Sequence, residues 1–118
     1  HSDETVSLII NNVNEENELT ELGSAVAVGE RLRREVIATA GSGRTAELVE
    51  ANEREVNNHT FYDLEYAVHL EDRDRHELAT VVVDRGRLYT LATSVNEDRW
   101  EKVQDLCGRV VHSLNLLI

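Results

Sequence analysis

The side chains of this 118-residue chain that are best suited to chemistry are histidines and carboxylates. The sequence has five histidines and 23 acidic residues. These are ligand types for Zn²⁺ and, where oxygen ligands predominate, for Mn²⁺ or Ca²⁺. The single cysteine, Cys107, excludes an intrachain disulfide and a zinc site built on cysteines. The composition therefore allows a metal site with histidine and carboxylate ligands. It does not indicate that the protein requires a cofactor.

Patterns typical of catalysis are poorly represented. The GSGR segment at 41–44 lacks the lysine and the strand-to-helix placement of a phosphate-binding loop. Serine, histidine and aspartate all occur, but their spacing indicates no catalytic triad. We therefore expect a protein that is not an enzyme.

Charge restricts the partners. The formal net charge is −11, which disfavours nucleic-acid binding because phosphate contacts need a basic face. The bases that do cluster lie in and just after the first predicted helix: Arg31, Arg33, Arg34 and Arg44. Arginine pairs with carboxylates in a bidentate manner, so this cluster predicts a docking patch for an acidic surface. The alternative is a solvated helix face that pairs with its own glutamates.

Hydrophobic periodicity predicts the elements that must position these residues. A strand is expected over 6–13, apolar enough to be largely buried, followed by a loop with one helical turn at 14–22. Ser24 is typical of an N-cap for a helix over 25–38. The helix has one apolar stripe at four-residue spacing, formed by Val28, Leu32 and Val36.

Four β segments follow and predict an antiparallel meander. They cover residues 45–56, 60–70, 78–84 and 87–94. The turns between them contain Asn57-Asn58, residues 71–74, and Arg85-Gly86, where Gly86 supplies a positive φ. In the second segment the alternate residues Tyr62, Leu64, Tyr66, Val68 and Leu70 form the apolar face that should meet the core.

A final helix is predicted to begin after Asn96, with acidic residues in its first turn. Its apolar face contains Trp100, Val103, Leu106, Cys107, Val110 and Val111. We expect Trp100 to be a core residue rather than a contact for a partner, and the apolar tail at 114–118 to be a short strand or a packed terminus. The order of elements predicts one α+β domain over 1–118, an antiparallel sheet with the helices over its faces.

Four segments together resemble the PsbP family, extrinsic proteins on the lumenal side of photosystem II. They are VSLIINNV at 6–13, LTELGSA at 19–25, FYDLEYAV at 61–68 and RHELATVVVDRGRLYTLATSVNEDRW at 75–100. Their order covers nearly the whole chain and is similar to the cyanobacterial and PsbP-like branch. The family's usual N-terminal segment with a YP-x-x-W strand pair is missing here, so we expect an exposed sheet edge. No signal or transit segment is visible, and we expect any targeting sequence to have been removed.

The resemblance implies an α/β/α sandwich around a central antiparallel sheet, a fold shared with Mog1, a nuclear Ran-binding protein. It implies a non-catalytic protein in the thylakoid lumen that binds lumenal subunits of photosystem II or of its assembly intermediates. Attachment to the membrane would be peripheral, through protein partners or through an N-terminal anchor. The alternatives are an accessory factor of another thylakoid complex, such as the NDH complex, and a stand-alone domain that binds divalent metal.

The resemblance also implies a site. Members of the family have held divalent metal near a histidine that corresponds to His76, with an acidic residue just before the Arg-Trp pair. That acid falls at Glu97 or Asp98, so the expected ligands of Zn²⁺, Mn²⁺ or Ca²⁺ are His76, Glu97 and Asp98. The alternative is that His76 is a strand-end histidine paired with a nearby carboxylate, and that Glu97 and Asp98 cap the N-terminus of the final helix. His59 and His69 are expected to be solvated.

Overall fold

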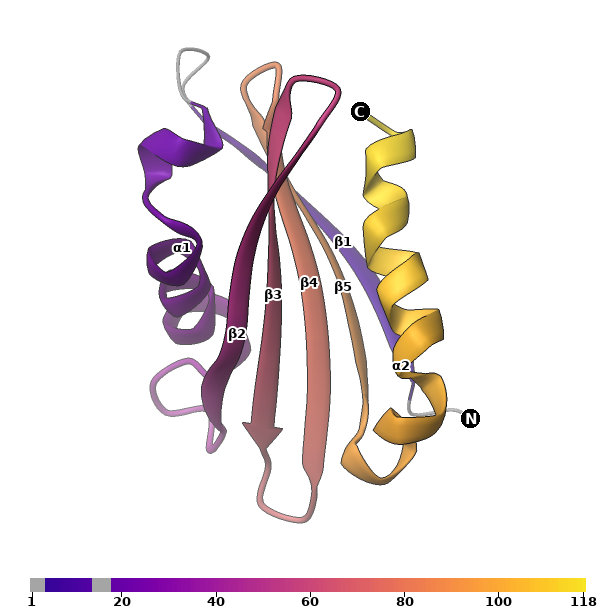
Figure 1. The fold of residues 1–118 in the computed structure, drawn as a ribbon. Helices are drawn as coiled ribbons and strands as arrows, with labels where there is room; N and C mark the ends of the chain where they lie inside the picture. Colours follow the sequence, from indigo (N-terminus) through magenta and orange to yellow (C-terminus); the bar gives the residue numbers. More distant parts are fainter. Residues whose placement is uncertain (1–3, 14–17) are drawn as a thin grey trace.

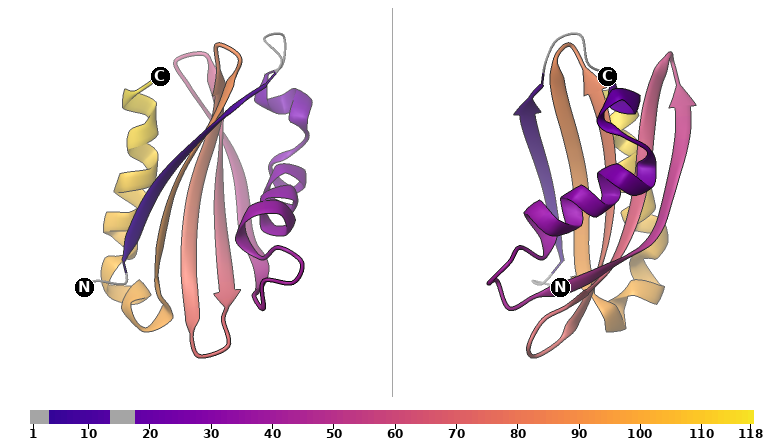
Figure 2. Two further views of the ribbon diagram at one scale, coloured as in Figure 1. Left: turned by 180° about the vertical axis from the view of Figure 1, so that it is seen from behind. Right: turned by 90° about the vertical axis from the view of Figure 1, so that its left-hand side faces the viewer.

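The structure, a computed structural model that describes residues 4–13 and 18–118, is an antiparallel sheet between two helices (Figure 1). The spatial order of the strands is β1-β5-β4-β3-β2. Their bounds are Thr5–Asn12, Thr45–Val56, His59–His69, Asp74–Asp84 and Arg87–Asn96 for β1 to β5. Helix α1 (Ala25–Leu32) lies on one face and α2 (Glu97–His112) on the other (Figures 1 and 2). The predicted α+β sandwich is confirmed.

Alternation along β3 divides the core into two layers. Tyr62, Leu64, Tyr66 and Val68 are at most 2% exposed and form the layer under α1, as predicted. Phe61 has the opposite orientation and is equally buried, at 1% exposure, in the layer on the α2 side. Both faces of the central strands are therefore covered, and β3 carries large apolar side chains on each.

Two tyrosine hydroxyls fix α1 against the sheet. The Tyr62 hydroxyl donates to the carbonyl of Gly23 at 2.7 Å, and the Tyr66 hydroxyl donates to that of Gly29 at 2.8 Å. Burial is the main cause that raises the pKa of Tyr66, with Glu30 and Glu77 adding to it. Gly29 permits the close approach, because a Cβ there would lie 2.9 Å from a methyl group of Leu48. The helix is thus held at short range by backbone acceptors rather than by apolar contact alone.

The end of the first helix differs from the expectation. After Leu32 the chain forms one π-helical turn, η2 (Arg33–Ile37), in which the Ala38 N–H donates to the Arg33 carbonyl at 2.9 Å. The wider turn shifts the helix phase by one residue. Ile37 packs against the core in place of Val36, which is 51% exposed. The predicted stripe is therefore correct at its first two positions and wrong at the third.

Strand β1 is also different from the expectation, because it is exposed along its whole length. The sequence predicted a largely buried strand. In the structure β1 is an edge strand, and among the described strands its one partner is β5. Val6 and Ile10 are 62% and 48% exposed. The main contacts of α1 are with β2, and those of α2 are with β4 and β5, so neither helix buries this edge. An apolar edge strand results.

The remaining expectations are met in part. The turn at Leu19–Leu22 is a 3-10 helix, whereas residues 14–17 of the predicted loop and the chain start at 1–3 lie outside the described residues. In α2, Cys107 and Val111 are buried but Leu106 is 52% exposed, so its place on the apolar face was wrong. The tail forms a 3-10 turn that buries Leu114 and leaves the next leucines exposed. No helix within the described ranges is long and apolar enough to cross a membrane.

Two tight turns set the strand register. Asn57 and Asn58 have φ values of 51° and 68°, and Arg85 and Gly86 have 51° and 75°. Positive φ at both central residues is the requirement of a type I′ hairpin turn. Arg85 is the exception in side-chain type, because a long side chain is unfavourable in the left-handed region where asparagine and glycine are tolerated.

We predict that Arg85→Asn raises the free energy of unfolding by about 0.5–1 kcal/mol, because it replaces a residue that is strained at positive φ with one that tolerates it. Urea denaturation measures the change. Arg87→Asn removes the same charge one residue past the turn and should give no gain. Equal effects of the two substitutions would attribute the change to charge rather than to the turn.

Candidate functional site

Strand β4 carries polar groups on both of its faces. Residues alternate along a strand, so Arg75 and Glu77 face the α1 side and His76 faces the α2 side. The pairing register places Arg75 opposite Asn96 and Glu77 opposite Ser94 on β5. In the pairing of β4 with its other neighbour, β3, His76 lies opposite Ala67. Two separate sites follow, one on each face of the sheet.

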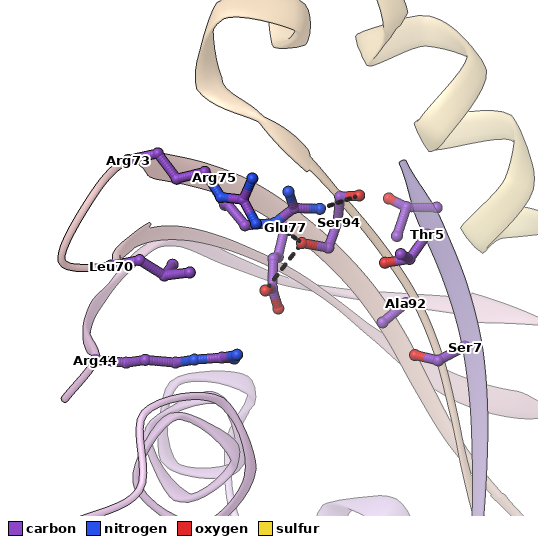
Figure 3. Close-up of a pocket in the computed structure, with 10 residues that line it drawn as sticks. Thr5, Ser7, Arg44, Leu70, Arg73, Arg75, Glu77, Ala92 and Ser94 are labelled. Carbon is purple, nitrogen blue, oxygen red and sulfur yellow. Dashed lines mark hydrogen bonds between the residues drawn. The ribbon is translucent and has the colours of Figure 1, made fainter. Parts of the chain in front are cut away.

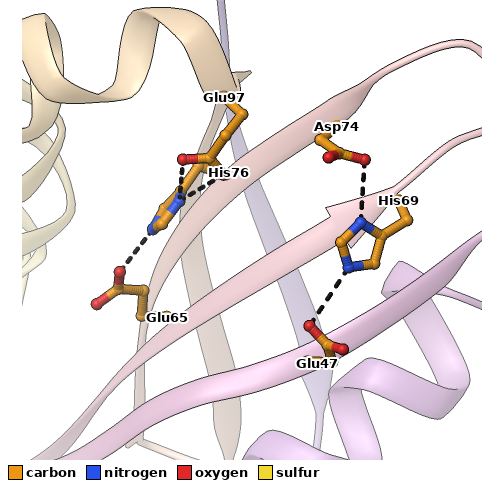
Figure 4. A network of polar contacts seen from close by, with 6 residues as sticks. All are labelled: Glu47, Glu65, His69, Asp74, His76 and Glu97. Atoms are coloured by element: carbon orange, nitrogen blue, oxygen red, sulfur yellow. Dashed lines mark hydrogen bonds and ion pairs between the residues drawn. The ribbon is translucent and has the colours of Figure 1, made fainter.

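His76 is enclosed by two carboxylates (Figure 4) and by an indole ring that the figure does not draw. Its Nδ1 lies 3.0 Å from Oε1 of Glu97, and its Nε2 lies 2.5 Å from Oε2 of Glu65. The Trp100 ring stacks on the imidazole at 3.8 Å between centroids with 10° between the planes. Only 8% of His76 is exposed. The residue is therefore a buried link between β4, β3 and the first turn of α2, and it has the carboxylate pairing that was given as the alternative to a metal site.

The surroundings of His76 define what it can do chemically. Its ring can donate to both carboxylates only when both nitrogens carry protons, whereas a metal ion needs a nitrogen lone pair. A metal at Nδ1 would have Glu97 as its adjacent carboxylate. The contacts of His76 among the described residues do not include Asp98, and no group of three or more metal-ligating side chains is found in that part of the chain.

Glu65 is the residue of this site that the sequence did not reveal. It belongs to the less apolar face of β3, two positions before the residue that pairs with His76. A diagonal neighbour across two strands is within reach of a long side chain. The pairing register between β3 and β4 would therefore have indicated that Glu65 lies near His76. That register depends on the turn at 70–73, and it could not be determined from composition.

Trp100 is half-buried, and the imidazole covers its inner face. The expectation of a core tryptophan is met in part, because the ring packs between α2 and the sheet but is only half-buried. Its place at the start of α2 also explains why His76 is so little exposed. The stacked pair closes the site on the side of the helix.

His69 and His59 both contact carboxylates rather than being simply solvated. Nδ1 of His69 lies 3.0 Å from Asp74, and its Nε2 lies 3.3 Å from Glu47 (Figure 4). The hydrogen bond to Asp74, followed by that to Glu47, raises the pKa of His69 above its usual value. Nε2 of His59 lies 2.8 Å from Asp84, and this side chain is 29% exposed. The expectation of solvated side chains was thus wrong for His59.

The arginines of the predicted docking patch separate into different environments. Arg33 donates to Glu30 at 2.8 Å, which is the helix-face pairing given as the alternative. Arg31 and Arg34 are exposed. Arg44 lies elsewhere, at the rim of a cavity that also contains Arg73 and Arg75 (Figure 3). Periodicity could not have joined these three, because they come from a loop, a turn and a strand.

The cavity has a volume of about 340 Å³ and lies on the α1 side of β4 and β5. The Arg75 guanidinium is fixed there, since its Nε donates to the Ser94 hydroxyl at 2.9 Å and its Nη1 donates to Asn96 at 2.9 Å. The Ser94 hydroxyl in turn donates to Glu77 at 3.1 Å. Burial raises the pKa of Glu77, and the hydrogen bond from Ser94 and the charges of Arg75 and Arg44 oppose that shift.

The fold and these sites define an α/β/α sandwich protein whose described polar clusters lie on the faces of its central strands. A sequence profile of the PsbP family matches residues 1–116, so the chain belongs to the PsbP family.

Individual relatives agree with this assignment. The chain is 41% identical over 118 residues to CyanoP of Thermosynechococcus vestitus, covering 96% of this chain and 64% of the relative. The solution structure of CyanoP from Synechocystis sp. is similar with a TM-score of 0.85 at 38% identity, covering 96% of this chain and 67% of that one. A third relative is the Arabidopsis thaliana photosynthetic NDH subunit of lumenal location 1, 32% identical over 66% of this chain and 33% of the relative. The chain thus spans under two thirds of the full length of the Thermosynechococcus and Arabidopsis proteins.

We predict that NMR titration gives His69 a pKa above the reference value of about 6.5, and that Asp74→Asn lowers it. A raised folded-state pKa means that the ion pairs of His69 stabilise the fold fully below the unfolded-state pKa. This stabilisation is lost as the pH rises through the folded-state value. His69→Gln should therefore reduce stability more at pH of about 5.5 than at about 8.5. The same loss at both pH values would exclude a charged His69.

Proposed function

We propose that this protein is a non-catalytic extrinsic protein of the thylakoid lumen that associates with photosystem II or with its assembly intermediates and supports the oxygen-evolving complex. The observation that carries the proposal is membership of the PsbP family over nearly the whole chain, together with a matching fold. A relative whose name gives a lumenal location supports the compartment.

The surface chemistry supports binding to proteins rather than to a substrate. The chain carries a net charge of −11, with 12 basic residues against 23 acidic ones. Arg31 and Arg34 project from the first helix, and Arg44 lies at the cavity rim. Charged contacts of this kind favour specific and salt-sensitive association with the lumenal subunits of photosystem II. Membrane attachment would then be peripheral, through those partners.

We predict that affinity-tagged protein, expressed in a photosynthetic host, co-purifies with photosystem II or with its assembly intermediates from solubilised thylakoids. Fractionation followed by immunoblotting measures this, and washing with high salt should release the protein. The control is an untagged strain. Recovery with the NDH complex alone would support the accessory-factor alternative, and absence from every photosystem fraction would contradict the proposal.

Divalent-metal binding at His76 is a second candidate, favoured by the 3.0 Å approach of Glu97 to Nδ1. Zn²⁺ suits a histidine and carboxylate pair best, and Mn²⁺ or Ca²⁺ would need more oxygen ligands. Glu65 contacts Nε2, on the other side of the imidazole ring, so it would orient the ring and would not be a ligand of a metal held at Nδ1.

We predict that Glu97→Gln weakens Zn²⁺ binding at least about tenfold in calorimetric titration, because it removes the carboxylate next to Nδ1. Binding to the unaltered protein should weaken as the pH falls, since protons compete for the imidazole. Asp98→Asn is the matched control and should leave the affinity unchanged. His76→Ala is a poor probe, because His76 is buried and supports the junction of α2 with the sheet. Equal affinities of Glu97→Gln and Asp98→Asn would remove the metal candidate.

A further inference from the structure

The turn between β4 and β5 holds a long side chain in a backbone conformation that does not suit it. Among the described residues, those other than glycine with positive φ are Asn57, Asn58 and Arg85. Asparagine tolerates the left-handed region, whereas arginine is unfavourable there. The two hairpin turns make the same demand on the backbone, and the other turn meets it with asparagines. The backbone therefore does not account for the arginine at position 85.

Packing within the fold does not account for Arg85 either. Its side chain is 92% exposed, and its ion pair with Asp84 is long, at 4.0 Å from Nε to Oδ2. The other oxygen of Asp84 lies 2.8 Å from Nε2 of His59. An exposed ion pair of this length contributes little to stability. A strained residue that gains so little inside its own fold indicates a role in contacts outside it.

A cavity of about 290 Å³ opens beside this turn. The turn contributes Arg85, Gly86 and Arg87 to its lining, and the end of β1 contributes Asn12 and the residue after it, Val13. The Val13 N–H donates to the Gly86 carbonyl at 2.8 Å. This hydrogen bond holds the end of β1 against the turn, so the two sides of the cavity are fixed relative to each other.

Charge differs between the two sides of the turn. The described residues that line the cavity beside β1 include two arginines and no acid, in a chain with a net charge of −11. A neighbouring cavity shares Arg85 and Gly86 with it, and its other charged residues are acids: Glu18, Glu55 and Asp84. The turn therefore separates a basic side, toward β1, from an acidic side, toward β3. Only the basic side favours the approach of an anion.

We propose that Arg85 and Arg87, with the end of β1, bind a side-chain carboxylate of an acidic protein segment. Guanidinium groups form planar, bidentate pairs with carboxylates, and the carboxamide of Asn12 can donate a further hydrogen bond. Val13 provides apolar contact for the methylene stem of a glutamate. The turn projects at one end of the sheet, where a partner can reach it (Figure 1). The inference stands on the turn alone, so this binding and co-purification with photosystem II can fail separately.

NMR titration of the purified protein with a blocked peptide of four consecutive glutamates tests the proposal. We expect the resonances of Val13, Gly86 and Arg87 to shift, and a peptide with glutamines in place of the glutamates to have no effect. Arg85→Asn should weaken binding about tenfold, because it removes a charge-assisted contact, and should raise the thermal midpoint, because it relieves the turn. Arg87→Asn should weaken binding to the same extent without a gain in stability. Weaker binding by a more stable variant cannot result from unfolding.

Arg109→Gln is the matched control, since it removes one exposed arginine of α2 that does not line the cavity, and it should leave the affinity unchanged. An equal loss of affinity in Arg109→Gln and Arg85→Asn would overturn the proposal in favour of non-specific attraction. Absence of binding to the glutamate peptide, or unchanged affinity in Arg85→Asn, would also overturn it. Inorganic phosphate is titrated in parallel, and tighter binding of phosphate than of the peptide would overturn the assignment to a carboxylate. Circular dichroism verifies that every variant is folded.

Discussion

The register of β4 between β3 and β5 is the constraint on which both polar sites depend. His76 meets Glu65 and Trp100 on one face, and Arg75 meets Ser94 on the other, because neighbouring residues of a strand point to opposite sides. A slip of one residue would exchange the faces, burying the arginine and the glutamate under α2. The two-residue turn at Arg85-Gly86 prevents that slip, and the apolar alternation of β3 reinforces it.

Unequal coverage of the sheet decides where polar groups can be accommodated. Each face has one helix, and the two helices lie over different strands, α1 over β2 and β3 and α2 over β4 and β5. Under a helix the sheet carries large apolar side chains, as at Tyr66 and Val82. Beyond the helix it carries hydroxyls and charges, as in the cavity with three arginines, or exposed apolar residues, as on β1. His76 and Glu65 are the exception, because they form a polar contact beneath the first turn of α2. The distribution of polar and apolar side chains over the sheet therefore follows largely from packing geometry.

Much of this could be predicted from the sequence, because period-two and period-four patterns report directly on buried faces. The strands, their turns, the apolar face of β3 and the two helices followed from such patterns, and so did the sandwich. Most of the errors share a physical origin. Strand β1, Glu65 and the grouping of Arg44 each depend on what lies beside a residue in space rather than along the chain, whereas Val36 is displaced by the π-helical turn. Local periodicity contains no information about which strand is at the edge or which loop bends toward which strand.

Because of the π-helical turn at Arg33–Ile37, the number of residues in this segment determines which side chains reach the core, as much as their types do. Leu32 and Ile37 both pack on the core although five positions separate them, so loss of a single intervening residue would restore a regular four-residue repeat of Val28, Leu32 and the present Ile37. A homologue with an uninterrupted α-helix here would have one residue fewer in this segment. An alignment without a gap would then place Ile37 one position away from its true counterpart in that homologue. Arg44 would be displaced in the same way, and a cavity arginine would be aligned with an unrelated residue.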